Sequence, residues 1–241
     1  PPSTAPAASP RERLTLRLQV PGDGVIDVAA EVVHADAGVA SLQLDVSATA
    51  QERLGTVNIA ALFSQTVTES DVAYDVKHGD TLGGIAKAHH TTVALLKRAN
   101  ELSGDMIRPG QTLKVTAWRF GIVVDKSQNQ LLLTQDDAFF KAYPVATGAD
   151  NSTPVGTFQI VNKIEKPVWY RQGAVVPANS PDNILGSRWM GLDQPGYGIH
   201  GSGEPSGIGQ QITAGCVRMR NEDVEELFAI VPRGTTVVIV D

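Results

Sequence analysis

The sequence predicts a mixed, mainly β protein with more than one domain. Three observations carry this prediction: alternating apolar residues near the start, a strand–helix–helix–strand pattern in the middle, and closely spaced short strands in the second half. At 241 residues the chain can form two or three separate cores. The expected parts are a Pro/Ala/Ser-rich segment at 1–12, an accessory β-meander with a helix at 13–70, a βααβ unit at 73–116 and a β-rich domain at 119–241.

Composition limits the class of partner. Apolar residues make up 42% of the chain and charged residues 19%, which is ordinary for a globular protein. The net charge of -6 argues against nucleic acid or an anionic membrane as the main partner. No apolar run is long enough to span a membrane. The Pro/Ala/Ser-rich start is typical of a linker, so we expect any signal peptide or anchor to lie outside this sequence.

The first structured part is a short β-meander. Leu14, Leu16 and Leu18 alternate with polar residues, which is the pattern of a half-buried strand. Turn residues then separate two further strands, so that strands are expected over 14–20, 25–33 and 39–45. Ser47 is placed to cap a helix that ends at about Phe63, and a polar linker follows. The sequence assigns no role to this accessory segment.

The middle of the chain has two short helices between two strands. The first strand is expected at Tyr74–Val76 and the closing strand at Thr112–Val115. Thr81 follows a Gly-Asp turn and is placed to cap a helix that ends near His89, because a threonine hydroxyl accepts the free N–H groups of a first turn. Thr91 or Thr92 is placed to cap a second helix, which ends near Asn100.

Two motifs in this unit resemble the LysM domain along its whole length. They are Val-Lys-x-Gly-Asp-Thr-Leu, which begins at Val76, and Ile-Arg-Pro-Gly-Gln-x-Leu, which begins at Ile107. The resemblance implies binding of N-acetylglucosamine-containing glycans, above all peptidoglycan, in a shallow groove between two loops. The groove residues that it implies are Gly79, Asp80, Thr81, Leu82, Met106, Ile107, Arg108 and Pro109. The simpler alternative is that Asp80 and Thr81 only cap the helix.

The neighbouring histidines His89 and His90 do not predict a metal site. Adjacent residues face different sides of a helix, and no third ligand stands near them in the sequence. No other cluster indicates a metal or an organic cofactor, so we expect neither.

The second half contains the chain's single cysteine, Cys216, with His200 sixteen positions earlier. A thiol attacks as thiolate, and an imidazole nearby is the usual means of activating it. Glycines surround both residues, which suits tight turns and a close approach to substrate. By residue type alone, a lone cysteine is more often a small buried apolar residue, so the local pattern decides. After Cys216, Asn221 is placed to cap a helix with Glu222 and Asp223 in its first turn.

That pattern reads Ile-His-Gly up to Gly201 and Thr-x-Gly-Cys-Val-Arg-Met from Thr213. It resembles the active-site signature of the L,D-transpeptidase (YkuD-type) catalytic domain. The resemblance extends over residues 120–240, with further landmarks at Thr153–Phe158, Pro167–Tyr170 and Gly186–Leu192. One position departs from it: where the family pattern has a second histidine, this chain has Ala214.

The resemblance implies roles for the site residues. Cys216 would be the nucleophile and His200 the base, with backbone N–H groups near Gly215 stabilising an oxyanion. Arg218 would either meet a substrate carboxylate or brace the loop through backbone carbonyls, since a guanidinium group does both. Weaker expectations are that Ser202 orients His200, that Tyr197 and Trp189 form either core or cleft wall, and that the Pro/Asn/Gly-rich loop from Arg171 to Leu185 is a lid or cleft wall.

The implied activity is acyl transfer in the bacterial cell envelope, periplasmic or otherwise extracytoplasmic. A stem tetrapeptide would form a thioester with release of D-Ala, and an amine of a second stem would then accept it in a 3→3 cross-link. Two alternatives stay open: an L,D-carboxypeptidase on the same scaffold, and a non-catalytic peptidoglycan-binding protein in which Ala214 marks a decayed site. The sequence indicates no oligomeric state.

Overall fold

A computed structural model of the chain describes residues 12–20, 24–34, 40–45, 48–171 and 173–241. The chain divides into two compact units, Pro1–Asn58 and Ile59–Asp241. Both contain β-sheet, and the large sheet of the second unit confirms the predicted mainly β class. None of the helices in the described ranges is long and apolar enough to cross a membrane.

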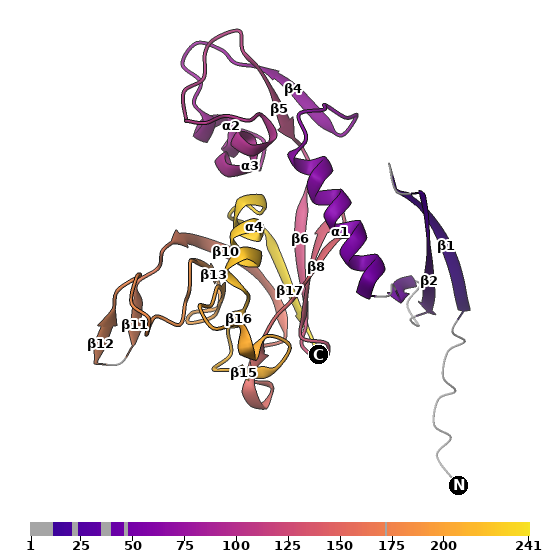
Figure 1. The fold of residues 1–241 in the computed structure, drawn as a ribbon, viewed down its shortest axis with the longest axis vertical. Helices are drawn as coiled ribbons and strands as arrows, with labels where there is room; N and C mark the ends of the chain where they lie inside the picture. Colours follow the sequence, from indigo (N-terminus) through magenta and orange to yellow (C-terminus); the bar gives the residue numbers. More distant parts are fainter. Residues whose placement is uncertain (1–11, 21–23, 35–39, 46–47, 172) are drawn as a thin grey trace. The chain divides into compact units, whose positions relative to one another are not determined.

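The first unit is an antiparallel three-stranded sheet followed by a helix (Figure 1). The strands are β1 (Glu12–Val20), β2 (Gly24–His34) and β3 (Ala40–Asp45), and helix α1 spans Ala48–Phe63. Leu14 pairs with Ala30, which pairs with Leu44 on its other side, so the predicted meander is confirmed. The expected cap residue Ser47 lies outside the described residues.

The βααβ unit consists of β4 (Asp71–Asp75), α2 (Leu82–Ala88), α3 (Val93–Ala99) and β5 (Thr112–Thr116). The two strands pair antiparallel. Thr81 Oγ1 accepts the Gly84 N–H at 3.0 Å, and Thr92 Oγ1 accepts the Leu95 N–H at 2.9 Å, so both predicted caps are confirmed. The first strand begins three residues earlier than predicted, at Asp71, whose carboxylate lies 3.4 Å from the buried amine of Lys114 on the partner strand.

Two leucines of α3 face different cores. Leu96 belongs to the small core of the βααβ unit, together with Ile85 and Leu113. Leu95 belongs instead to the large core of the β-rich part, and both leucines are 1% exposed. The Thr92 hydroxyl also donates to the carbonyl of Ala229 in helix α4 (Asn221–Ile230). The βααβ unit therefore packs directly on the β-rich part.

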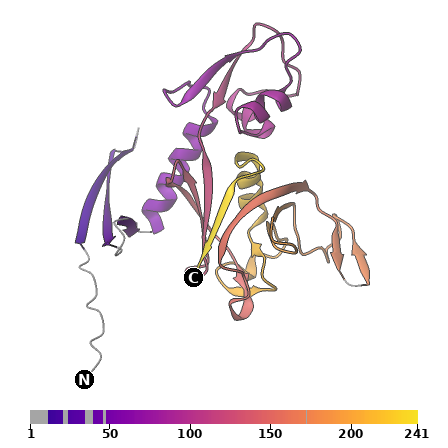
Figure 2. The ribbon, with the colours of Figure 1, turned by 180° about the vertical axis from the view of Figure 1, so that it is seen from behind.

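The β-rich part is built on an eight-stranded sheet of order β16-β14-β13-β10-β17-β6-β7-β8 (Figures 1 and 2). Two pairs, β17 with β6 and β14 with β16, are parallel, and the others are antiparallel. The strands are β6 (Phe120–Asp125), β7 (Gln130–Gln135), β8 (Ala138–Pro144), β10 (Gly156–Glu165), β13 (Arg188–Leu192), β14 (Gly198–His200), β16 (Val217–Arg218) and β17 (Thr236–Val240).

Shorter elements surround this sheet. They are β9 (Thr147–Gly148) paired with β15 (Gln211–Thr213), the hairpin of β11 (Trp169–Arg171) and β12 (Ala174–Val176), and 3-10 turns at Ala149–Asn151 and Pro205–Gly207. From the sequence alone, residues 139–147 would form a single strand. The structure differs, because β8 ends at Pro144 and the chain turns to pair β9 with β15.

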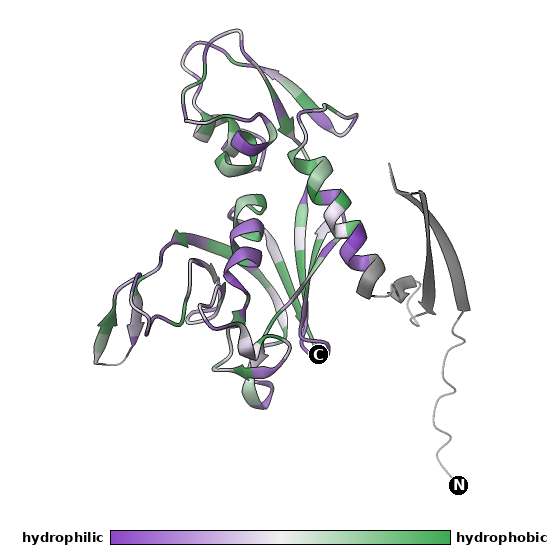
Figure 3. Ribbon diagram, viewed as in Figure 1, coloured by the Kyte–Doolittle hydropathy of each residue, from purple (hydrophilic) through white to green (hydrophobic). Residues whose placement is uncertain are grey.

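Strand β10 joins the two halves of the sheet. It is long because it pairs first with β17, over Gly156–Gln159, and then with β13, over Ile160–Glu165. A bulge between Ile160 and Asn162 marks the change of partner. Alternating apolar residues along the sheet (Figure 3) bury one face, including Ile122, Val124, Leu131, Leu133, Val237 and Ile239.

Helix α4 packs on this sheet with Val224, Leu227 and Ile230 buried. The prediction that Asn221 caps the helix is wrong. Arg220 occupies the cap position without a side-chain bond, and Asn221 is the first helical residue. The Asn221 carboxamide oxygen instead accepts the backbone N–H of Ser187 at 2.9 Å, which ties the start of the helix to the turn before β13. A long-range hydrogen bond to Ser187 thus takes the place of the expected local cap by Asn221.

Candidate active site

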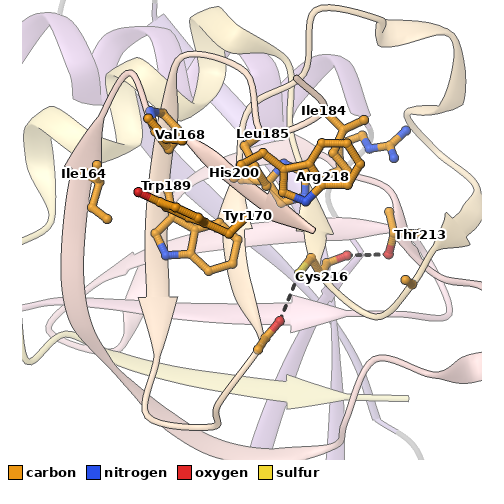
Figure 4. A pocket seen from close by; sticks show the side chains of 14 residues that line it. Ile164, Val168, Tyr170, Ile184, Leu185, Trp189, His200, Thr213, Cys216 and Arg218 are labelled. Carbon is orange, nitrogen blue, oxygen red and sulfur yellow. Dashed lines mark hydrogen bonds between the residues drawn. The ribbon is translucent and has the colours of Figure 1, made fainter. Parts of the chain in front are cut away.

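Cys216, His200 and Arg218 line one pocket, with a volume of about 480 Å³ (Figure 4). The sheet brings them together although they are distant in sequence. Strand β14 ends at His200, and β16 begins directly after Cys216; the two strands pair parallel with Ile199 opposite Val217. The nucleophile and base expected from the sequence therefore sit at neighbouring strand ends.

The ring of His200 is held in one orientation. Its Nδ1 lies 2.7 Å from the carbonyl oxygen of Gly201, and a carbonyl only accepts, so Nδ1 carries the proton and the Nε2 lone pair is free. The ring also stacks on Trp189, with centroids 5.9 Å apart and planes 22° apart. Burial lowers the pKa of His200 to about 4, against the raising effect of the Gly201 carbonyl. The imidazole is therefore neutral at pH 7, with an unprotonated Nε2.

The thiol of Cys216 is partly accessible and donates to the Gly196 carbonyl at 3.6 Å. Burial raises its pKa, while the backbone N–H of Gly198 and the charge of Arg218 act in the opposite direction. At neutral pH the pair is thus a thiol beside a neutral imidazole. The expectation that the nearby imidazole lowers the thiol pKa in the resting protein is not met, because burial disfavours both charged forms.

The turn before Cys216 has a backbone that only glycine adopts easily. Gly215 has φ = +123°, and a Cβ there would lie 2.6 Å from Cε1 of Tyr197. The Gly215 N–H is already bound, at 3.2 Å, by the hydroxyl of Thr213, and that hydroxyl donates to the Cys216 carbonyl at 2.6 Å (Figure 4). Within the described residues the Cys216 N–H has no hydrogen-bond partner, so it is the donor that an oxyanion can use.

Arg218 reaches the same pocket with an unsatisfied side chain. Its backbone exchanges two 2.8 Å hydrogen bonds with Ala146. Its side-chain Nε is buried with no hydrogen-bond partner, and no carboxylate in the described parts of the chain lies within ion-pair distance of it. Of the two roles expected for Arg218, this favours contact with a substrate carboxylate over bracing of the loop.

Two expected site residues lie outside this pocket. The Ser202 hydroxyl bonds the backbone of Glu204, donating at 3.0 Å and accepting at 3.1 Å, so the expectation that it orients His200 is wrong. Gly201 performs that task through its carbonyl. Tyr197 packs beneath the turn of Gly215 against the large core, which is the packing role. Trp189, by contrast, does line the pocket.

Apolar side chains form the rest of the pocket, including Ile164, Val168, Tyr170 and Ile184 (Figure 4). All four are unusually exposed for their type, Tyr170 to 75%. The loop expected as a lid or cleft wall contributes through Ile184 and Leu185. Asn183 fixes this loop: it is 8% exposed, donates to the carbonyls of Pro167 and Pro177, and accepts the Leu185 N–H. The roles of Asn183 and Ile164 were missed, because these two residues follow no sequence period.

In the βααβ unit, Gly79, Thr81 and Pro109 of the expected groove are exposed, as are Met106 and Arg108. The Asp80 carboxylate accepts the Tyr74 hydroxyl at 2.9 Å and the Lys77 N–H at 2.7 Å, and these bonds lower its pKa. Leu82 is buried in the small core and Ile107 packs against it, so Leu82 is accessible only through its backbone. The described residues contain no group of side chains that could hold a metal ion.

Comparisons with known proteins agree with both the pocket of the β-rich part and the βααβ unit. Residues 119–239 match the family description "L,D-transpeptidase catalytic domain", and residues 74–116 match "LysM domain". The chain is 37% identical over 174 residues to the putative L,D-transpeptidase YkuD of Bacillus licheniformis, covering 69% of this chain and 97% of that protein. It is 39% identical over 126 residues to the putative L,D-transpeptidase YqjB of Bacillus subtilis, covering 50% and 70%.

Solved structures include the catalytic domain of an L,D-transpeptidase from E. faecium, determined by NMR. It is 26% identical to this chain, with a TM-score of 0.42, and the match covers 50% of this chain and 96% of that domain.

Proposed function

This chain belongs to the L,D-transpeptidase (YkuD-type) family and carries a LysM domain, and from that premise we propose that it cross-links peptidoglycan stems through a thioester on Cys216. The observation that carries the proposal is the shared pocket of Cys216, His200 and Arg218. Each of the three supplies a different chemical function, namely a nucleophile, a base and a cation.

The first half-reaction breaks an amide bond. Sγ of Cys216 forms a bond to the carbonyl carbon between the third stem residue and the terminal D-Ala, and its proton passes to Nε2 of His200. The carbonyl electron pair moves onto oxygen, where the Cys216 N–H stabilises it. When the tetrahedral intermediate collapses, the C–N bond breaks and the nitrogen of D-Ala takes the proton from the imidazolium. The product is a thioester and free D-Ala.

The second half-reaction regenerates the thiol. The side-chain amine of a second stem's diamino acid attacks the thioester carbon and gives up a proton to the now neutral His200. The C–S bond then breaks, and the sulfur recovers the proton from the imidazolium. A new amide links the third residues of two stems. A bound substrate that covers the exposed apolar wall around Tyr170 would displace water, which would give hydrolysis instead.

Arg218 is proposed to bind a stem carboxylate. Its Nε is buried without a partner, and a substrate carboxylate would supply one. A guanidinium group binds a carboxylate through two parallel hydrogen bonds, which fixes the stem relative to the thiol. The field of this cation also favours the anionic sulfur, in agreement with its lowering effect on the thiol pKa.

The LysM domain is proposed to hold the glycan strand, with the exposed Gly79–Thr81 loop facing the Met106–Pro109 loop across the groove. Binding of the glycan would raise the local concentration of stems at the pocket without adding a catalytic group. These substrates place the protein in the bacterial cell envelope, outside the cytoplasm. No nucleic acid, metal or organic cofactor has a role in this scheme.

The test is incubation of the purified chain with tetrapeptide muropeptides, followed by mass analysis of protein and products. We expect an acyl adduct on Cys216, release of D-Ala and cross-linked dimers. The Cys216→Ala variant should form neither adduct nor product while keeping its fold. Tripeptides in place of dimers would identify a carboxypeptidase. A folded natural chain that forms no adduct, yet sediments with peptidoglycan, would identify a binding protein.

A further inference from the structure

The hydroxyl of Thr213 bonds the two peptide groups on either side of the one that carries the Cys216 N–H. It donates to the Cys216 carbonyl at 2.6 Å and accepts the Gly215 N–H at 3.2 Å, while the side chain is 5% exposed. A hydroxyl with one proton and two lone pairs can make both bonds at once. The peptide planes before and after the Gly215–Cys216 peptide are thereby tied to one side chain.

The backbone of Thr213 is itself fixed. It ends strand β15, and it pairs with Gly148 of β9. The turn after β15 also lies close to β9, because a Cβ on Gly148 would lie 3.0 Å from Cα of Gly215. Strand pairing therefore holds the Thr213 backbone, and with it the hydroxyl, next to the turn.

We infer that Thr213 is a positioning residue, which sets the direction of the Cys216 N–H so that it points at the developing oxyanion. Thr213 occupies the Gly215 N–H and the Cys216 carbonyl, and within the described residues the Cys216 N–H between them is a free donor. If the hydroxyl is lost, the two flanking peptide planes can rotate, and the N–H held between them no longer has a fixed direction. This inference rests on the proposed function.

If Thr213 acts through the Cys216 N–H, its loss should affect one reaction of the thiol and not another. Acylation at a carbonyl generates an oxyanion and needs the N–H. Alkylation by iodoacetamide forms an S–C bond with loss of iodide and generates no oxyanion. A residue that acts through the N–H affects the first reaction only, whereas a residue that merely supports the fold affects both.

The experiment compares Thr213→Val, which removes the hydroxyl at nearly constant volume, with Thr213→Ser, which retains it. The matched control is Thr235→Val: Thr235 is also 5% exposed and its hydroxyl donates to a carbonyl, that of Pro232 at 2.8 Å, away from the pocket. Each full-length variant is treated separately with a carbapenem and with iodoacetamide. The carbapenem acylates the thiol when its β-lactam ring opens, and the ring nitrogen takes the thiol proton. Intact mass gives both rates.

We expect Thr213→Val to lose roughly 10²-fold in acylation rate, in the range found for removal of one oxyanion donor, with alkylation within about threefold of the natural chain. Thr213→Ser should regain most of the acylation, and Thr235→Val should change neither rate. Unchanged acylation in Thr213→Val, an equal loss of both reactions, or failure of Thr213→Ser to rescue would each overturn the inference.

Amide hydrogen exchange at Gly215 provides a readout that does not require activity. Thr213→Val should accelerate this exchange by at least about tenfold relative to Thr213→Ser, because the N–H loses its acceptor. Equal exchange in the two variants would overturn the inference. A natural chain that is alkylated but never acylated would contradict the proposed function, and Gly215 exchange would still decide whether Thr213 holds the turn.

Discussion

Cys216 and His200 are both uncharged at neutral pH in the folded protein, and this decides how the thiol is activated. Burial raises the pKa of Cys216 and lowers that of His200 to about 4. Proton transfer to Nε2 therefore accompanies the attack on a carbonyl and does not precede it. The carbonyl of Gly201 makes this possible by fixing the proton on Nδ1. The pair differs in this respect from a preformed thiolate–imidazolium pair.

The pH dependence of alkylation tests this conclusion. A thiol ordinarily has a pKa of about 8.5, and a thiol with a raised pKa stays protonated until the pH exceeds that value. The iodoacetamide rate at Cys216 should thus rise about tenfold per pH unit between pH 6 and 8, with no plateau at acidic pH. A preformed ion pair would give a plateau from about pH 5 upward, and such a plateau would contradict neutral resting groups.

Ala214 is exposed at the edge of the pocket, where the family pattern has a histidine. His200 already serves as the base, and the backbone supplies the oxyanion donor, so neither function needs a side chain at this position. Replacing Ala214 with histidine should therefore change the carbapenem acylation rate by no more than about tenfold, compared with the 10²–10⁴-fold typical of an acid–base group. If Ala214→His converts an inert protein into an active one, the natural chain is a binding protein.

At the scale of elements, the pocket is assembled from strand ends and one fixed loop. The nucleophile turn depends on β9, β15 and β16, and the base depends on β14. The opposite wall comes from β10, the β11–β12 hairpin and the loop after it. Asn183 is the main polar support of that loop, because its carboxamide bonds the Pro167 carbonyl and the Leu185 N–H. It also adds a second hydrogen bond to the Pro177 carbonyl, which already accepts the Ser180 N–H.

Asn183→Ala should therefore loosen Ile184 and Leu185 without touching the thiol. We expect a loss of about 1–3 kcal/mol in the free energy of unfolding, from the buried groups left unpaired. The carbapenem concentration for half-maximal acylation should rise more than the limiting rate falls. The matched control is Asn179→Ala, an exposed asparagine of the same loop, which should change neither quantity. If the two variants behaved alike, Asn183 would not be the support of this loop.

At the scale of the whole second unit, the LysM domain is packed against the catalytic domain as well as being linked to it. Leu95 lies in the catalytic core, the Thr92 hydroxyl donates to Ala229, and helices α3 and α4 are in contact. Lys114 ties the LysM domain to the segment before it, because its amine donates to the carbonyl of Ser64 at 2.8 Å, just after α1. Removing the whole LysM domain would therefore expose part of the catalytic core.

The adjacent leucines of α3 give a matched test. Both are 1% exposed, but Leu95 contributes to the catalytic core and Leu96 to the LysM core. Each leucine-to-alanine change should cost about 2–5 kcal/mol in its own core. Segment-resolved hydrogen exchange should show faster opening around α4 in Leu95→Ala and around β5 in Leu96→Ala. The same pattern in both variants would contradict separate cores joined by a shared helix.

The sequence by itself determined the mainly β class, the βααβ unit with its Thr81 cap, and the choice of Cys216 and His200 as one candidate site, because these features depend on local periods, turn residues and short motifs. It left the second cap open between Thr91 and Thr92, and the structure selects Thr92. Tertiary structure decided the rest. Asn221 bonds Ser187 in place of capping its helix, Ser202 turns to Glu204, and β10 extends to serve two partner strands. Tertiary structure also decides the neutral state of the thiol and imidazole, because the chain segments that bury them meet only in the folded protein.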